Sequence, residues 1–506
     1  MRVQALTAIL GIELLLFVSL GGCGHKTTAP PATPLTPTVF EPLKEQLKKS
    51  YLELFRTAPR MEYSPAQIAA MREYLKRAGS YCAGSLDQRA KEYEKQLASD
   101  RSELQTGAAG LTEGDRHNLH CSVQNTRAAM TRAKVLAQTA IPVAYQNREA
   151  KLDLIQNWPA DLSQIQQQIA SGTYRNRRWG DVQDIGFREV AANQQDDIKT
   201  GQDAIRDMKA QGLMPKPVED PAVVNYVNQV AQRVAQHSDL HIPLHVTVLN
   251  SKEINAFALP GGYLFIERGL LEAADNESQL AGVIAHEIGH DAARHGHKLM
   301  VRSTVTSIFY QAAEVAAIML TGGVASIGIY YALQYGFYGL GLILNLNLLG
   351  VSREYELEAD QLGIQYAWNS GYDPQGFINF FDKMATKEGY VTGLSWFHSH
   401  PPFYQRMVDT EREMMFLPRK QPLVTNTSGF GAMKQALDRV SAKARQEEQD
   451  PNRPSLLSPE PGCAPPPPIS IAGQQQIEGI CQIQPEQLKP RLGEAEGSPA
   501  DDSSQP

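Results

Sequence analysis

The segment His286-Glu287-Ile288-Gly289-His290 is the feature that most constrains how this chain can fold. It lies within Leu280 to Arg294, where apolar residues recur with a helical period, so we expect a helix. Side chains four residues apart share one helix face. Both imidazoles can then reach one zinc ion, while Glu287 approaches water beside that ion without binding it. The pattern also recurs by chance, and the alternative is a helix with two exposed histidines.

A catalytic zinc site needs a third protein ligand and an open fourth position. In one class of zinc sites a third histidine follows the first by ten residues, but here Gly296 occupies that position. The neighbouring His295 and His297 are expected to be helix-terminal or solvated residues, because basic side chains suit a helix C-terminus. The third ligand is therefore expected from a later segment.

A later acidic segment, Glu356-Leu357-Glu358-Ala359-Asp360, lies in a second helical pattern. Glu356 and Asp360 are four residues apart and share a helix face. Glu356 could therefore bind zinc, while Asp360 accepts the other N–H of a ligand histidine and fixes its tautomer. Glu358 is expected to point away. The alternative interpretation of all three acids is a solvated helix face.

The N-terminus has the pattern of an exported protein. An apolar run from Ala5 to Leu20 is followed by Gly21-Gly22-Cys23, which resembles the lipobox of bacterial lipoproteins and predicts lipidation of Cys23. An ordinary signal peptide or an uncleaved anchor helix are the alternatives. An even number of cysteines remains, in two sequence-local pairs, which suits an oxidising compartment and makes a Cys82–Cys121 bridge conceivable; unpaired thiols are the alternative. These disulfide candidates are Cys82, Cys121, Cys463 and Cys481.

Composition excludes several classes of protein. The chain has 506 residues, enough for about three structural units, so a single small module is excluded. Its 42% hydrophobic content and 20% charged content fit a mostly soluble chain with a large core and exclude a polytopic membrane protein. The net charge is −7 and no basic run is present, so no nucleic-acid partner is expected.

The pattern along the chain predicts an α+β fold that is mainly helical. Strands are expected at His241–Leu249 and Ile254–Ile266, giving a small sheet. A weak helix at Ala432–Gln446 is expected within an otherwise disordered tail. The predicted units are a signal peptide (1–23), a Pro/Thr-rich tether (24–40), a helical or coiled-coil module (41–180), a metallopeptidase domain (181–419) and a mostly disordered Pro/Gln/acidic tail (420–506).

An apolar insert, residues 303–351, separates the two candidate ligand segments, and Glu314 is its only charged residue. It is long enough for two helices of about 20 residues each. An odd number of membrane crossings is impossible if His286 and Glu356 meet at one metal. Polar residues and several tyrosines favour a helical hairpin at the membrane surface or against the active site over a spanning hairpin.

Four stretches in order resemble peptidase family M48, the zinc metallopeptidases of CAAX prenyl protease type, and especially its periplasmic branch, the β-barrel assembly-enhancing proteases. They are Asn255 to Gly262, His286 to His290, Ser352 to Asp360, and His400-Pro401 followed by Arg406. The resemblance covers about residues 185–415 and implies a gluzincin-type domain with one zinc ion per chain. It implies zinc binding by the residues His286, His290 and Glu356, with Glu287 as the catalytic base.

The resemblance also implies roles for the other matching stretches. It implies an edge strand beside the zinc whose backbone pairs with an extended substrate. This strand comprises Asn255, Ala256, Phe257 and Ala258. His400 would either occupy the open zinc position and hold the enzyme latent or, with Arg406, stabilise the oxyanion or organise the pocket. A loop histidine without a role is the alternative for His400, and His398 is expected to be idle.

Together these observations predict a zinc endopeptidase of the bacterial cell envelope that hydrolyses misfolded or stalled envelope proteins. It would face the periplasm, held to a membrane by its lipid anchor, with the apolar insert either at the membrane surface or against the active site. Two other classes stay open. One is a chaperone-like envelope assembly factor with a structural or latent zinc site, and the other is a binding scaffold. The helical module is expected to act either as a spacer or as a docking site for a partner that the sequence does not identify.

Overall fold

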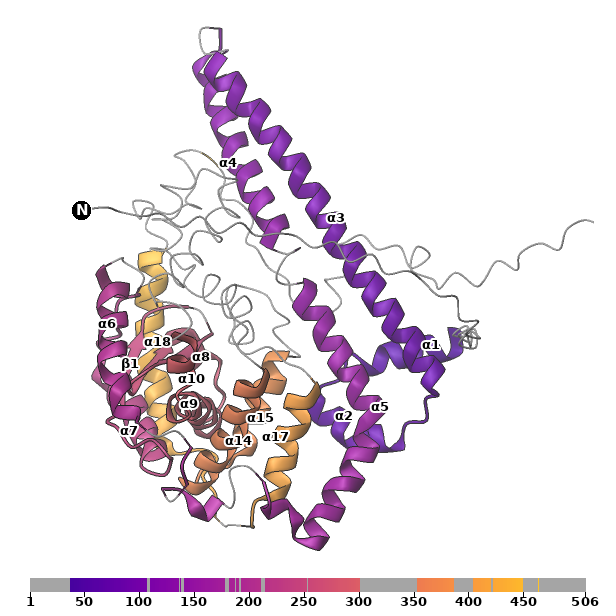
Figure 1. Ribbon diagram of the computed structural model, residues 1–506. Coiled ribbons are helices and arrows are strands. Elements are labelled where there is room, and N and C mark those ends of the chain that lie inside the picture. Colours follow the sequence, from indigo (N-terminus) through magenta and orange to yellow (C-terminus); the bar gives the residue numbers. More distant parts are fainter. Residues whose placement is uncertain are drawn as a thin grey trace, which may run out of the picture.

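The computed structural model is mainly helical with one small sheet, which confirms the predicted fold class (Figure 1). It describes residues 37–106, 110–135, 137, 141–177, 182–186, 188–190, 193–210, 214–252, 254–300, 353–385, 404–419, 422–448 and 463. The predicted signal peptide, Cys23, the tether up to residue 36, the apolar insert, His398, His400 and Cys481 lie outside these residues. None of the helices within the described residues is long and apolar enough to cross a membrane.

The sheet contains three strands in the order β1 (His245–Leu249), β3 (Tyr263–Glu267), β2 (Ala256–Leu259). β1 runs parallel to β3, and β2 runs antiparallel to it. Successive side chains point to opposite faces of a strand, and both faces are covered here. Phe265 packs with α6 (Asp197–Ala210), while its neighbours Leu264 and Ile266 belong to the main core.

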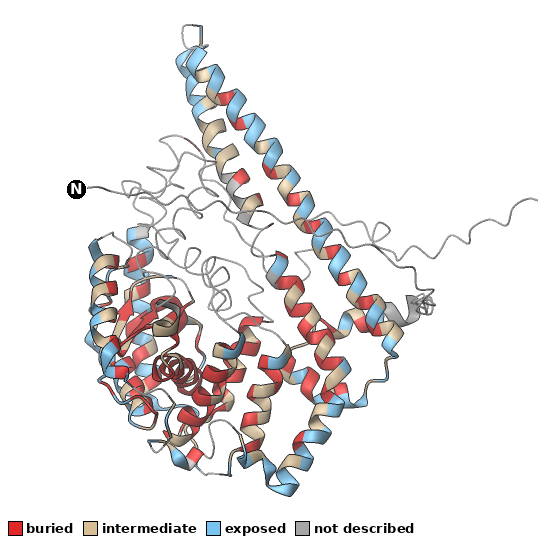
Figure 2. Cartoon of the chain, in the orientation of Figure 1, coloured by how far each residue is buried: buried red, intermediate tan, exposed pale blue. Residues whose placement is uncertain are grey.

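The main core forms around α9 (Glu277–Ala292), which is buried along nearly its whole length (Figure 2). The side chain of Asn276 caps its N-terminus by accepting a hydrogen bond from the Gln279 backbone N–H. α9 packs against β2 and four helices. These are α7 (Pro221–Ala235), α10 (His295–Met300), α14 (Arg353–Asn369) and α15 (Gln375–Lys383).

α9 and α14 cross with their backbones almost in contact. A Cβ atom added to Gly363 would lie 2.9 Å from the Cα of His286, and one added to Gly289 would lie 3.0 Å from the carbonyl oxygen of Ala359. Any side chain at Gly363 would push the helices apart. The glycines therefore set how closely the two candidate ligand segments approach each other.

The N-terminal helices form a long arm joined to the rest of the folded body. α3 (Pro65–Thr106) and α4 (Glu113–Val135) run side by side as a helical hairpin and project from the body (Figure 1). α5 (Ile141–Ser171) packs against α17 (Tyr404–Phe416). α1 (Pro37–Gln46) packs on α3, and α2 (Tyr51–Thr57) lies on α5. The Asp382 carboxylate accepts a 2.6 Å hydrogen bond from the Tyr51 backbone N–H at the start of α2.

The packed region extends beyond the boundary predicted at residue 419. The expected helix at Ala432–Gln446 is present and longer, as α18 (Ser428–Glu448). It packs against α7 and α8 (Arg268–Ala273), burying Phe430, Met433 and Leu437. The Lys434 ammonium donates to three backbone carbonyl oxygens at the end of α8. This part of the predicted tail therefore belongs to the folded domain.

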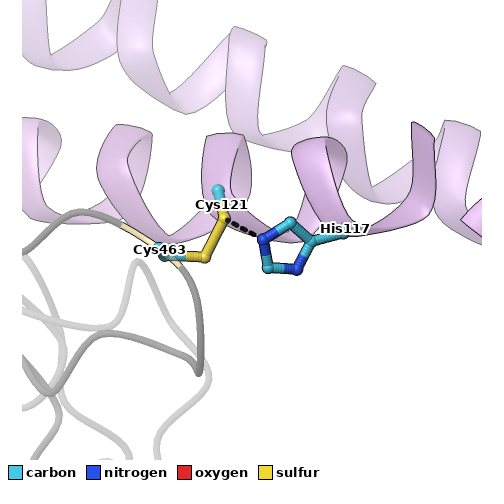
Figure 3. The surroundings of a disulfide bond; sticks show 3 residues. All are labelled: His117, Cys121 and Cys463. Atoms are coloured by element: carbon cyan, nitrogen blue, oxygen red, sulfur yellow. Dashed lines mark hydrogen bonds between the residues drawn. A yellow bond between two sulfur atoms is a disulfide. The ribbon is translucent and has the colours of Figure 1, made fainter. Parts of the chain in front are cut away.

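The pairing of Cys82 with Cys121 that the sequence suggested is wrong, because Cys121 on α4 forms a disulfide with Cys463 (Figure 3). Ser122 donates to Asp100, and this contact fixes the register of the α3–α4 hairpin. Cys82 is 18 residues before Asp100, which is about 27 Å along a helix and too far for a bridge. Cys82 is itself disulfide-bonded.

Peptide mapping without reductant tests the cysteine pairing. We expect a fragment that joins the Cys121 peptide to the Cys463 peptide and separates when a reductant is added. Mass spectrometry of a digest made at acidic pH, where thiols do not exchange, provides the measurement. A fragment that joins Cys82 to Cys121 would contradict the described pairing.

The packing of α18 predicts that removing a buried side chain from its interface lowers the stability of the protein. Replacement of the buried Phe430 with Ala should lower the free energy of unfolding by about 3–5 kcal/mol, because it leaves a cavity against Tyr226 and the rest of the core. Chemical denaturation measures this loss. The matched control is Lys443→Ala on the exposed side of α18, which should change stability by about 0.5 kcal/mol or less. Equal effects would show that α18 is not docked.

Candidate metal centre

α9 and α14 bring together the three side chains that the sequence proposed as metal ligands. His286 and His290 lie one turn apart on α9, with their Nε2 atoms 3.0 Å apart. Glu356 lies in the first turn of α14, with Oε2 3.7 Å from Nε2 of His286 and Oε1 3.4 Å from Nε2 of His290. One donor atom from each residue lies within 4.8 Å of the others. Two imidazole nitrogens and one carboxylate oxygen form the donor set of a catalytic zinc site.

Glu287 is also buried beside these residues, although it does not belong to the converging donor set. Its carboxylate interacts electrostatically with the guanidinium of Arg406. Glu287 follows His286 directly on α9, so the two residues lie in the same region of the helix but on different faces. The motif thus delivers two donors and one separate carboxylate, as its spacing predicted.

Asp360 and Arg406 form a buried ion pair behind the donors. Oδ1 of Asp360 lies 2.9 Å from Nδ1 of His286, the neighbour relation that the i, i+4 spacing of α14 predicted. Arg406 on α17 contacts both oxygens of Asp360 at 2.6 and 2.9 Å, and its Nη1 lies 2.9 Å from Oε2 of Glu356. Burial alone lowers the pKa of the guanidinium, but the surrounding carboxylates outweigh burial and raise it. Arg406 therefore stays charged and compensates both acids.

His295 lies at a helix end, one of the two positions expected for it, as the first residue of α10. It is not solvated, because it is 2% exposed and its Nδ1 lies 2.8 Å from Nδ1 of His290. Glu358 does not belong to the converging donors, but it is buried and its Oε2 lies 3.3 Å from Nε2 of the same His295. Burial lowers the pKa of His295, and the Glu358 carboxylate acts in the opposite direction. His297 fits its expectation better, since it is partly exposed and contacts Asp197.

Sequence reasoning missed His295 because of the backbone that precedes it. α9 ends at Ala292, and Arg294 then takes a left-handed conformation with φ of 56°, which turns the chain back towards His290. Both Nε and Nη2 of Arg294 donate to the Asp197 carboxylate, at 2.6 and 2.7 Å. Glycine or asparagine normally signals such a turn, and this sequence has neither at that position.

The predicted substrate strand begins one residue later than expected, because β2 starts at Ala256, directly after Asn255. In the sheet order β2 is an edge strand, and α9 packs against it. The opposite edge, along β1, is covered by hydrogen bonds with residues 216–218. Within the described part of the chain, β2 therefore offers the sheet's open edge. Phe257 on β2 stacks on Phe265 of β3.

The fold and this donor set define a metallopeptidase domain. Residues 221–413 match the model of peptidase family M48, and the chain thus carries a domain of this family. This range includes the donor residues, Glu287, Asp360 and Arg406. It omits the N-terminal arm.

Curated relatives agree with this assignment. The β-barrel assembly-enhancing protease of Yersinia pestis is 32% identical over 189 residues, which are 37% of this chain and 37% of that protein. The protein of the same name from Escherichia coli K12 is 32% identical over 174 residues, 34% of this chain and 35% of that protein. Mitochondrial metalloendopeptidase OMA1 of Schizosaccharomyces pombe is 31% identical over 229 residues, 44% of this chain and 61% of that protein. The chain spans little more than a third of the length of these assembly-enhancing proteases.

The burial of Arg406 predicts that its charge supports the fold. In metal-free protein, Arg406→Met should lower the free energy of unfolding by about 3–5 kcal/mol, because Glu356 and Asp360 lose their buried cation. Urea denaturation in a chelator measures the loss. Arg412→Met is the control: it lies on the same helix in a partly exposed i, i+3 pair with Asp409 and should cost about 1 kcal/mol or less. Equal losses would contradict a compensating role for Arg406.

Proposed function

We propose that the chain is a zinc-dependent endopeptidase of gluzincin type that hydrolyses peptide bonds of misfolded or stalled proteins in the bacterial cell envelope. The observation that carries this proposal is the convergence of His286, His290 and Glu356, with a separate carboxylate, Glu287, buried beside them. The family match and the metalloendopeptidase relative support the class of reaction.

The residues present fit a zinc ion. The Nδ1 atoms of both histidines face other groups, Asp360 and His295, so the Nε2 atoms are the ones that approach Glu356. His286, His290 and Glu356 would hold the ion. When bound, zinc supplies a Lewis acid that acidifies water and polarises a carbonyl oxygen. The buried setting of these residues strengthens both effects.

The chain's own residues supply the rest of the mechanism. Glu287 accepts the proton of the attacking water and delivers it to the leaving amine, the role of a general base that becomes a general acid. Arg406 holds Glu356 and Asp360 in place through its two ion pairs. Backbone groups on the open edge of β2 pair with an extended substrate and align its scissile bond. This pairing recognises the backbone of the substrate rather than its amino-acid sequence.

The cellular setting is part of the proposal. Lipidation of Cys23 would anchor the chain to a membrane with its folded part facing the periplasm, and the Cys121–Cys463 bond suits an oxidising compartment. The name of the bacterial relatives, β-barrel assembly-enhancing protease, supports envelope proteins as the substrate class. His400 is proposed as a latch on the open metal position or as an oxyanion stabiliser, whereas Arg406, buried behind the donors, organises the pocket through its ion pairs.

Cleavage of casein tests the reaction class. The chain from Gly24 onward, carrying His400→Ala so that latency cannot hide activity, should degrade casein in the presence of zinc. Adding Glu287→Gln should reduce the rate by about 100-fold or more, because the general base is lost, while zinc content stays the same. Adding Glu354→Gln, an exposed acid on α14, should leave the rate unchanged.

Each other outcome decides between function classes. No cleavage by either zinc-loaded variant would favour a chaperone-like assembly factor with a structural metal. Purified protein without zinc, and without affinity for it, would favour a binding scaffold. Equal cleavage by the Glu287→Gln variant would remove Glu287 from the mechanism.

A further inference from the structure

We propose that His295 is a positioning residue that fixes the tautomer and orientation of His290 and thereby sets the zinc affinity of the site. This inference rests on the proposed metal site and extends it to residues outside the donor set. It rests on three described contacts of His295: one with His290, one with Glu358 and one with the ring of Tyr355.

The contact pattern allows one consistent arrangement of protons. A neutral imidazole that offers the lone pair of Nε2 to a metal carries its proton on Nδ1. For His290 that proton points to Nδ1 of His295, 2.8 Å away, which must then be an acceptor. Neutral His295 consequently carries its own proton on Nε2, and this N–H faces the Glu358 carboxylate at 3.3 Å. Each N–H in the series of contacts from His290 through His295 to Glu358 then meets an acceptor.

The reverse arrangement fails on the same contacts. If Nδ1 of His295 donated to His290, the proton of a neutral His290 would sit on Nε2, where it blocks metal binding. Nε2 of neutral His295 would then present a lone pair to the Glu358 carboxylate, and two acceptors would face each other in a buried place. Glu358 therefore selects the tautomer of His295, and His295 selects the tautomer of His290.

The surrounding structure holds His295 in one orientation. Its ring stacks on Tyr355, with centroids 4.4 Å apart and planes at 11°. Tyr355 and Glu358 are three residues apart on α14, so they share one face of the helix, while Glu356 and Asp360 share another. One face of α14 thus supplies the proposed ligand Glu356. The other face contacts His295, the residue behind the second proposed ligand, His290. The left-handed turn at Arg294, tied to Asp197, places His295 there.

The two histidine ligands therefore have different supports. The Nδ1 atom of His286 faces a carboxylate, Asp360, whereas Nδ1 of His290 faces an imidazole that in turn contacts the Glu358 carboxylate. Groups of this kind behind a ligand change metal affinity by about 10–100-fold when they are removed. The same range is expected for His295.

Zinc affinity, measured by competition with a fluorescent chelator on the full mature chain, tests the proposal without any assay of activity. His295→Leu removes the acceptor and should weaken zinc binding by about 10–100-fold. His295→Asn places an amide oxygen near the position of Nδ1 and should retain affinity within about threefold of the unmodified protein. His237→Leu is the control and should leave zinc affinity unchanged, since this partly exposed histidine contacts the Arg233 backbone carbonyl rather than the site or Asp197.

Thermal unfolding in a chelator separates positioning from folding. A structural role alone would lower the metal-free melting temperature and leave zinc affinity unchanged. If His295→Leu fails to fold because Glu358 is left without its partner, the double variant His295→Leu/Glu358→Leu removes both buried polar groups and should show the same loss of zinc affinity. Wild-type affinity in folded His295→Leu or in the double variant would overturn the inference, as would equal losses in the Asn and Leu variants. Failure of the unmodified chain to bind zinc would instead contradict the proposed function.

Discussion

The direct contact between the backbones of α9 and α14 is the constraint on which the rest of the site depends. Gly289 and Gly363 lie at the crossing, and any side chain at Gly363 would separate the helices. Only a crossing this close lets a carboxylate from the first turn of α14 reach the Nε2 atoms of both histidines on α9. The chain between the two helices is long, so the site depends on packing between segments that are distant in sequence.

That packing buries several acidic groups close together, which carries an electrostatic cost. Glu287, Glu356, Glu358 and Asp360 are all nearly inaccessible to water. Arg406 compensates two of them directly, and a buried carboxylate without compensation is strongly destabilising. A divalent cation between the histidines and Glu356 would compensate part of the negative charge of these buried carboxylates. Metal binding and folding stability are then linked in this domain.

The sequence revealed the groups that obey helical spacing and concealed those that depend on turns and distant packing. The i, i+4 pairs His286/His290 and Glu356/Asp360 could be recognised because both segments are regular helices. His295 could not, because its position follows from a left-handed Arg294 that no glycine signals. The pairing of Cys121 with Cys463 was equally hidden. Sequence proximity suggested Cys82, whereas the hairpin register carries Cys82 far along the arm.

The Cys121–Cys463 bond joins residues 342 positions apart and so closes a covalent ring that contains both helices of the metal centre. If any one peptide bond within this ring is cut, the two pieces remain covalently joined through the disulfide. A nick made by the enzyme itself or by a neighbouring peptidase would not release a fragment. In an oxidising compartment, the physical integrity of the molecule then depends on two sulfur atoms as well as on the continuity of its backbone.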